Sequence, residues 1–181
     1  MRPRQPLPRL WLMTDERQGT SLWAALERLP HGAGVVFRHY GAANRRALYA
    51  RVRRVARRRG LVLVVAGGER LPGADGVHNR RGRGIRTASA HGVAELRQQE
   101  REGADLVFVS PVFPTRSHPN ARALGPVRFG LVARHARVPV IALGGMDAGR
   151  FRRVKKLGAY GWAAIDAWSA KAPLPEGEGL G

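Results

Sequence analysis

His91 is the side chain with the clearest capacity for chemistry in this sequence, and it directly follows the short run 85–90. An imidazole gains and loses a proton near neutral pH, so a histidine beside a substrate can act as general acid and base. A histidine at this place could equally be structural, with its ring hydrogen-bonded to a loop. The sequence leaves both interpretations of His91 open.

A glycine pair suits the binding of an anion. Gly144 and Gly145 directly follow an apolar run, and a glycine pair lets backbone N–H groups come close to a phosphate. The pair could also be only a tight turn from a strand to a helix. We expect the phosphate role, because the pair follows the seventh apolar run and a β/α barrel usually binds phosphate near its seventh and eighth strands.

Eight short apolar runs would position these residues. They span 10–13, 34–37, 61–65, 75–78, 85–90, 105–109, 138–143 and 160–165. Amphipathic helical stretches lie between several of them, which is typical of a parallel α/β fold, and eight runs predict a TIM (β/α)8 barrel. The active site of such a barrel lies at the C-terminal ends of its strands. The candidate residues there are Thr14, Asp15, Arg38, His39, Tyr40, Gly67, Gly68, His78, Asn79, Ser89, His91, Ser110, Thr115, Gly144, Gly145 and Asp166.

The predicted helices are unevenly distributed. The clearest contains Leu48, Val52 and Val55 at helical spacing, ends at Gly60 and carries mostly arginine on its outer face. Others are predicted over 22–29, from 93, from 126, and over 151–157 with an end at Gly158. The connections 66–74 and 79–84 are too short for a full helix, so we expect a barrel trimmed after strands three and four. A crossover between neighbouring parallel strands usually takes a dozen or more residues, so 79–84 is the main objection to a regular barrel.

Length and composition bound the class of protein. A chain of 181 residues is one domain's worth, and we assign a single barrel domain to 8–170 and a disordered tail to 171–181. The absence of cysteine excludes disulfides, thiolate metal sites and a cysteine nucleophile. No segment approaches the ~20 apolar residues of a membrane helix, and the first residues lack the apolar part of a signal peptide. We therefore expect a soluble cytoplasmic protein with no membrane partner.

The charge is strongly positive, with 32 Lys and Arg against 13 Asp and Glu, a formal net charge of +19. Such a field attracts phosphates and nucleic acid non-specifically at low ionic strength. Aromatic residues are only 7% of the chain and scattered, whereas specific nucleic-acid binding uses stacking aromatics or a recognition element. We therefore interpret the arginines of the second predicted helix as a solvated outer face.

Seven segments carry a resemblance to a known family. They are Leu-Trp-Leu-Met-Thr-Asp at 10–15, Gly-Ala-Asp-Gly-Val-His at 73–78, Ser-Ala-His at 89–91, Gly-Ala-Asp at 103–105, Ser-Pro-Val-Phe-Pro-Thr at 110–115, Pro-Val-Ile-Ala-Leu-Gly-Gly-Met at 139–146 and Gly-Ala-Tyr-Gly-Trp-Ala-Ala-Ile at 158–165. In this order and spacing, over 10–168, the chain resembles the thiamine-phosphate synthase and TenI family. The resemblance implies a TIM barrel and a role in thiamine biosynthesis.

Two activities are implied by this resemblance. The synthase joins an aminopyrimidine diphosphate to a thiazole phosphate with loss of pyrophosphate, using magnesium. The other branch is a thiazole tautomerase, which needs no metal and relies on an acid/base histidine that maps onto His91. The implied partner is a small phosphorylated substrate, magnesium is a cofactor only if synthase activity is retained, and the oligomeric state, a homo-oligomer included, stays open.

The resemblance carries over unevenly, and better on the phosphate side than on the metal side. It assigns Gly144 and Gly145 to the thiazole phosphate, and Thr115 and Ser117 to the loop that contacts pyrophosphate. Arg38 retains the arginine of the family's Gln-x-Arg-x-Lys pattern, whereas Val36 and Tyr40 stand at its glutamine and lysine positions, and the lysine expected in the pyrophosphate loop is missing. Asp166 stands where the family has a small residue, so it brings a negative charge towards the phosphate.

The metal side departs from the family. One magnesium aspartate belongs to an Asn-Asp-Arg motif after the third strand, where this chain has Ala-Gly-Gly-Glu-Arg at 66–70. The other follows the Val-His after the fourth strand, in a loop that here reads Asn-Arg-Arg-Gly-Arg-Gly at 79–84. Magnesium requires hard oxygen ligands, and Glu69 is the one nearby carboxylate. We therefore assign no metal ligand.

Three functions remain open from the sequence. The first is a thiamine-pathway enzyme, either a synthase with rebuilt metal ligation or a tautomerase that uses His91. The second is a family member that binds a phosphorylated thiazole or related anion without catalysis. The third is a basic barrel that binds nucleic acid, whose affinity would fall steeply with ionic strength.

Overall fold

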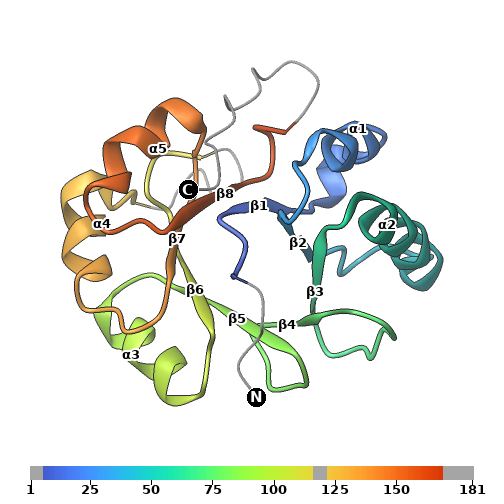
Figure 1. Ribbon diagram of the computed structural model, residues 1–181, viewed down its shortest axis with the longest axis horizontal. Coiled ribbons are helices and arrows are strands. Elements are labelled where there is room, and N and C mark those ends of the chain that lie inside the picture. Colours follow the sequence, from blue (N-terminus) through green and yellow to red (C-terminus); the bar gives the residue numbers. More distant parts are fainter. Residues whose placement is uncertain (1–5, 116–121, 169–181) are drawn as a thin grey trace.

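The chain folds into a closed barrel of eight parallel strands, seen in a computed structural model that describes residues 6–115 and 122–168. Each strand pairs with the next along the chain, and the last pairs with the first (Figure 1). The strands are β1 (Leu10–Met13), β2 (Gly34–Phe37), β3 (Val62–Ala66), β4 (Gly76–His78), β5 (Ile85–Ala90), β6 (Leu106–Val109), β7 (Val140–Leu143) and β8 (Gly161–Ala164). The predicted TIM barrel is confirmed.

The helices cover only part of the barrel, as the sequence predicts. They are the short 3-10 helix η1 (Glu16–Gln18) and the α-helices α1 (Ser21–Arg28), α2 (Arg45–Arg59), α3 (Val93–Arg101), α4 (Gly125–Ala133) and α5 (Ala148–Lys155). Figure 1 shows α1 and α2 outside the first strands and α3, α4 and α5 around the last ones. Among the described residues, none of the helices follows β3 or β4, so the trimming falls where it was expected.

The short link between β4 and β5 is compatible with the barrel because β4 is itself short. A strand of three residues is about 10 Å long, and the six residues 79–84 can span about 20 Å when extended. Asn79 and Gly84 both have positive φ, 54° and 79°, which turns the chain back at each end of the link. The expectation that a dozen residues are needed is therefore wrong at this place.

Several predicted boundaries shift by one or two residues. The third run begins at Val62 rather than Leu61, because the Leu61 N–H bonds to the carbonyl oxygen of Ala56 and completes the end of α2. The predicted helix over 151–157 ends at Lys155, and the N–H of Ala159 closes it on the Val154 carbonyl. Gly60 ends α2 in the left-handed conformation, as predicted.

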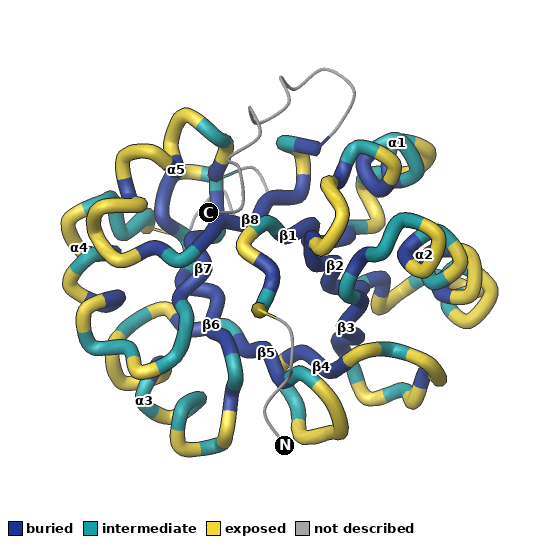
Figure 2. The backbone as a smooth tube through the Cα atoms, viewed as in Figure 1, coloured by how far each residue is buried: buried dark blue, intermediate teal, exposed yellow. Residues whose placement is uncertain are grey.

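The apolar residues form two layers, separated by the strands. Trp11 and Met13 belong to a cluster inside the barrel, whereas Leu12 between them belongs to the layer under the helices. The Trp11 ring meets Phe108 edge-on at 5.3 Å, and a Cβ at Gly34 would come within 2.2 Å of it. The barrel interior is therefore packed with side chains, and Figure 2 shows the strands buried and the outer helix surfaces exposed.

Among the residues that the structure describes, none of the helices is long and apolar enough to cross a membrane.

Candidate functional site at the C-terminal ends of the strands

The C-terminal ends of β1 and β2 are joined by a buried hydroxyl–imidazole pair. Thr14 Oγ1 accepts the backbone N–H of Arg38 at 2.9 Å and lies 3.0 Å from His39 Nδ1. Burial of the His39 ring lowers its pKa below the ordinary value of 6.5, so the ring is neutral at neutral pH. The pair fixes the backbone of Arg38, a predicted phosphate ligand, at this end of the barrel.

Asp15 is held between two arginines. Its carboxylate accepts Arg17 Nε at 2.7 Å and Arg38 Nη2 at 3.2 Å, and it also caps η1 through the Arg17 N–H. Burial raises the pKa of this carboxyl, but the hydrogen bonds from Arg17 and the charges of Arg17 and Arg38 outweigh it and leave the pKa lowered. Arg38 is thus oriented by an ionised carboxylate, while its buried Nε has no hydrogen-bond partner among the described residues.

Asp166, which follows β8, interacts electrostatically with Arg17. The pKa of the Arg17 guanidinium is raised by its hydrogen bond to Asp15 and further by the negative charge of Asp166. The negative charge that the sequence places towards the phosphate therefore has a nearby cation in Arg17. This pairing reduces the repulsion that Asp166 would exert on a bound anion.

His78 lies inside the barrel and is not available as a proton carrier at neutral pH. Its Nδ1 is 2.9 Å from Thr87 Oγ1 and its Nε2 is 3.3 Å from Ser89 Oγ. Burial, with a contribution from the Arg38 charge, lowers the pKa of His78 to about 3. Ser89, a predicted substrate ligand, is therefore engaged by His78, and its backbone N–H donates to Asn79 Oδ1 at 2.7 Å.

His91, the predicted acid/base residue, follows β5 with 61% of its side chain exposed. Its backbone N–H donates to Glu95 Oε2 at 2.9 Å, and its Nδ1 lies 2.9 Å from the same oxygen. The pKa of Glu95 is lowered by these two hydrogen bonds, so its carboxylate is ionised and orients the imidazole. The structure places His91 at the predicted end of the barrel, with its Nδ1 turned to α3.

Gly144 and Gly145 pack against the segment that follows β6. The N–H of Phe113 donates to the Gly144 carbonyl at 3.0 Å, and Cβ atoms on the two glycines would lie 2.8 Å from Pro111 and 2.5 Å from the Pro114 carbonyl oxygen. Their φ angles are +93° and +59°, which also favours glycine. The glycine pair therefore forms a tight turn after β7, as the alternative interpretation predicted.

The N–H groups of this glycine pair are candidates for binding an anion, although Gly144 is buried and Gly145 half-buried. Within the described chain, neither Gly144 nor Gly145 donates its backbone N–H to another residue, although Gly144 accepts one hydrogen bond and Gly145 accepts one from Arg150. Ser110 and Thr115, predicted ligands of the neighbouring segment, are half-buried beside them. Ser117 lies outside the described residues, as does the predicted tail 171–181.

The residues present do not fit the magnesium that the resemblance implies. Glu69, the one carboxylate near the expected position, accepts Arg45 Nη1 at 3.0 Å and Arg46 Nε at 2.5 Å, one arginine on each oxygen. Hydrogen bonds from these two arginines lower the pKa of Glu69. No group of three or more His, Asp or Glu side chains within 6–115 and 122–168 is arranged to hold a metal ion.

Sequence reasoning missed Arg45 and Arg80 as residues of this end of the barrel. Arg45, at the start of α2, donates to the carbonyl oxygens of His39 and Ala66, both at 2.6 Å. Arg80 extends from the loop after β4 to the loop after β3. The only signal in the sequence was that both residues lie near strand ends. Many other arginines do so too, so this signal could not identify these two.

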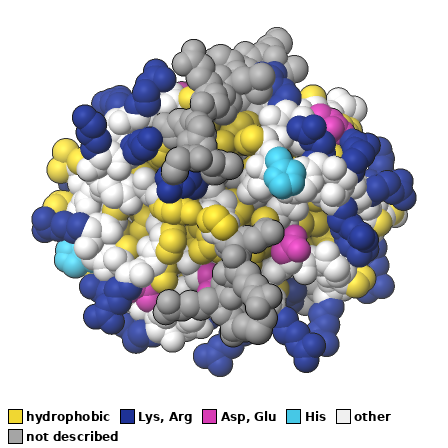
Figure 3. Space-filling model, in the orientation of Figure 1, with side chains coloured by type: hydrophobic (Ala, Val, Ile, Leu, Met, Phe, Trp, Pro, Cys, Tyr) yellow, Lys and Arg dark blue, Asp and Glu magenta, His cyan; other side chains and the backbone are white. Residues whose placement is uncertain are grey.

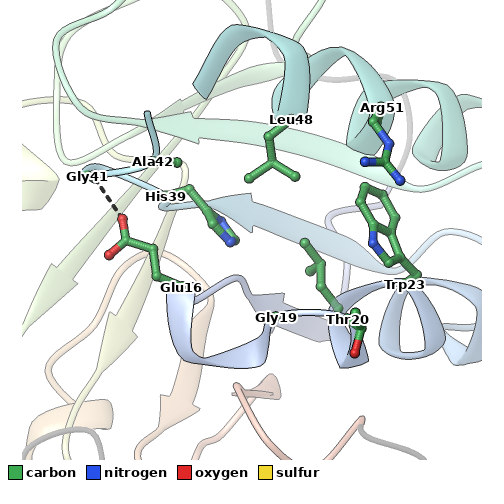
Figure 4. Close-up of a pocket in the computed structure, with 10 residues that line it drawn as sticks. Glu16, Gly19, Thr20, Trp23, His39, Gly41, Ala42, Leu48 and Arg51 are labelled. Atoms are coloured by element: carbon green, nitrogen blue, oxygen red, sulfur yellow. Dashed lines mark hydrogen bonds between the residues drawn. The ribbon is translucent and has the colours of Figure 1, made fainter. Parts of the chain in front are cut away.

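The molecule also has an open cleft outside the barrel, with a volume of about 560 Å³. Figure 4 shows it between α1 and α2, with Trp23 and Arg51 at one end and His39 and Glu16 at the other. The Arg51 guanidinium lies over the Trp23 ring, 4.3 Å from its centre. Except for His39, the lining residues are distinct from the candidate site residues.

Comparisons with known proteins agree with this architecture. The family model for thiamine monophosphate synthase matches residues 10–168. The thiamine-phosphate synthase of Chloroflexus aurantiacus is 32% identical, over 88% of this chain and 84% of that protein. A putative thiamine-phosphate synthase 2 of Aquifex aeolicus is 40% identical over a shorter stretch, 42% of this chain and 41% of that protein.

A solved structure shares the fold. The thiamine phosphate pyrophosphorylase of Pyrococcus furiosus superposes with a TM-score of 0.72, at 24% identity, over 91% of this chain and 89% of that one. The likeness extends over the whole barrel, from β1 to β8. By its family match and its relatives, the chain belongs to the thiamine-phosphate synthase and TenI family.

Proposed function

We propose that this protein binds a phosphorylated thiazole of thiamine biosynthesis at the C-terminal ends of its strands, without a metal ion. The observation that carries the proposal is the glycine pair after β7, whose two backbone N–H groups have no acceptor within the described chain. The phosphate site of a TIM barrel commonly lies beside strands seven and eight. We include a cytoplasmic location in the same proposal.

The charge at this end of the barrel supports an anionic ligand. Arg38 presents a guanidinium that Asp15 orients but does not fully satisfy, since its buried Nε has no partner among the described residues. A guanidinium stays protonated at every physiological pH and matches phosphate oxygens in geometry. Arg38 can therefore contribute charge while the glycine pair contributes hydrogen bonds.

The metal-dependent condensation is the less favoured activity. The family reaction uses two aspartates for magnesium, after the third and fourth strands, and the two carboxylate oxygens of Glu69, the one described carboxylate near those strand ends, are each bound by an arginine. A cation there would have to displace guanidinium groups from both. We therefore derive no step that uses magnesium.

Tautomerisation of the thiazole is the second candidate function, and the His91–Glu95 pair favours it. A tautomerase removes a proton from one carbon and delivers one elsewhere on the same ring, which a single acid/base group can do. Glu95 fixes the Nδ1 side of the imidazole at 2.9 Å, which leaves Nε2 for a substrate. On the face shown in Figure 3, the Lys and Arg side chains lie mostly around the rim and do not form one stripe, so this face gives no support to nucleic-acid binding.

Titration of thiazole phosphate by calorimetry, in the presence of a metal chelator, tests the proposed function. We expect saturable binding that Gly144→Ala weakens about tenfold or more, because the new Cβ would strain a left-handed backbone and displace Pro111. Gly68→Ala is the control, since a Cβ there meets nothing within 4 Å. A melting temperature for each variant separates loss of the site from unfolding.

Two results would count against the proposal. If thiazole phosphate does not bind the wild-type chain, with or without magnesium, this ligand class is excluded. Pyrophosphate release from the aminopyrimidine diphosphate and thiazole phosphate, dependent on magnesium, would show instead that synthase activity survives. Loss of tautomerisation in His91→Ala with unchanged thiazole phosphate affinity would select the second candidate function.

A further inference from the structure

Arg80 links the two loops in which the resemblance places the magnesium aspartates. It belongs to the loop after β4, and its guanidinium reaches the carbonyl oxygens of Gly68 and Glu69 in the loop after β3, at 3.3 and 3.4 Å. Both contacts are long for N–H···O hydrogen bonds. The buried Nε of Arg80 has no partner at all within the described chain. The guanidinium is thus held in place but not satisfied.

The surroundings of Arg80 leave no carboxylate for a divalent cation. Glu69, whose carbonyl Arg80 contacts, has each carboxylate oxygen occupied by another arginine. The other charged residues of the loop 79–84 are Arg81 and Arg83, both exposed. A divalent cation would meet backbone oxygens and positive charge here, whereas an anion would meet a guanidinium whose Nε has no hydrogen-bond partner in the described chain.

We propose that the Arg80 guanidinium replaces the divalent cation at this edge of the barrel and binds a phosphate or diphosphate group directly. The proposal goes beyond the proposed function, because it adds a second anion site, at the loops after β3 and β4, to the phosphate site of the glycine pair after β7. Arg80 exchanges its long contacts with the two carbonyl oxygens for charge-assisted hydrogen bonds to phosphate oxygens, and its Nε gains an acceptor. No bond is made or broken in this step.

Inorganic pyrophosphate is the probe for this proposal. Calorimetric titration of the full chain should give saturable binding in a metal chelator, and added magnesium should not strengthen it. Arg80→Met should weaken the binding about tenfold or more, because a desolvated guanidinium–phosphate contact is lost. Arg83→Met, which removes the same charge from an exposed position of the same loop, should change it less than about twofold.

The outcomes separate this proposal from the proposed function. Pyrophosphate binding that requires magnesium, or that weakens equally in Arg83→Met and Arg80→Met, overturns the role of Arg80 and leaves thiazole phosphate binding untouched. Absence of pyrophosphate binding under both conditions also overturns it. If thiazole phosphate fails to bind while pyrophosphate behaves as expected, the proposed function falls and the Arg80 site stands. Melting temperatures verify that Arg80→Met is folded.

Discussion

At the scale of single residues, the candidate site is a set of arginines with fixed carboxylate partners. Arg38 with Asp15 and Arg45 with Glu69 are ion pairs between residues more than 20 positions apart in the chain. The sequence predicted Arg38, Gly144 and Gly145 at the correct end of the barrel, because position after a strand determines that. It could not predict the pairs, because any of many arginines could have faced each carboxylate.

The buried His78 predicts how stability depends on pH. The pKa of His78 is about 3 in the folded protein, against 6.5 ordinarily, so below pH 6.5 the unfolded chain binds a proton that the folded chain does not. Acid therefore favours unfolding, and the stability present above pH 6.5 falls as the pH drops towards 3, by on the order of 1 kcal/mol per pH unit.

Urea denaturation at several pH values between 7 and 4 measures this effect. His78→Asn, which can keep the contact with Thr87 but cannot bind the proton, should show a shallower loss of unfolding free energy. His31→Asn, at an exposed position, should follow the wild-type slope. Parallel curves for all three proteins would contradict a neutral buried His78.

At the scale of elements, the sequence predicted all eight strands, because each is an apolar run bounded by turn residues. Their ends were less predictable: whether Leu61 starts β3 or completes α2 depends on one hydrogen bond, to the carbonyl oxygen of Ala56. The sequence predicted a connection from β4 to β5 without a helix, but could not show that it is feasible, because feasibility depends on the length of β4, which the apolar pattern does not fix. Element type therefore followed from sequence, while boundaries and connections needed tertiary contacts.

Arg45 connects three of these elements, and its removal should destabilise the barrel. From the first residue of α2, Arg45 donates to the carbonyl oxygens of His39 and Ala66 at the ends of β2 and β3. Arg45→Met leaves these oxygens without their donors, so we expect a loss of about 2 kcal/mol of unfolding free energy. Arg54→Met, exposed on the same helix, should stay within about 0.5 kcal/mol of wild type. Equal losses in chemical denaturation would show that Arg45 acts only through its charge.

At the scale of the whole molecule, the net charge of +19 acts independently of the site. Most of the charged side chains on the face shown in Figure 3 lie at the periphery, where salt screens them. Self-repulsion of this kind destabilises a compact state. The composition alone predicted the sign and size of this charge. Only the fold shows which arginines belong to the peripheral surface and which are paired with carboxylates at the site.

Salt should therefore change stability and non-specific binding in opposite directions. Raising the ionic strength from about 0.01 M to about 1 M shortens the screening length from ~30 to ~3 Å, so the melting temperature should rise. Affinity for a DNA duplex of arbitrary sequence should fall linearly with salt on logarithmic axes. A duplex of one sequence that stays bound at high salt, while scrambled duplexes are released, would revive the nucleic-acid function.

The missing helices around β4 give the barrel a seam. Within the described chain, no helix lies between β3 and β4 or between β4 and β5, and β4 is only three residues long. Opening the wall there uncovers little apolar surface, so it costs less free energy than opening a strand that carries a helix. We therefore expect amide hydrogen exchange to be fast in the links on either side of β4, next to Arg80. Insertions and new chain termini should also be tolerated there.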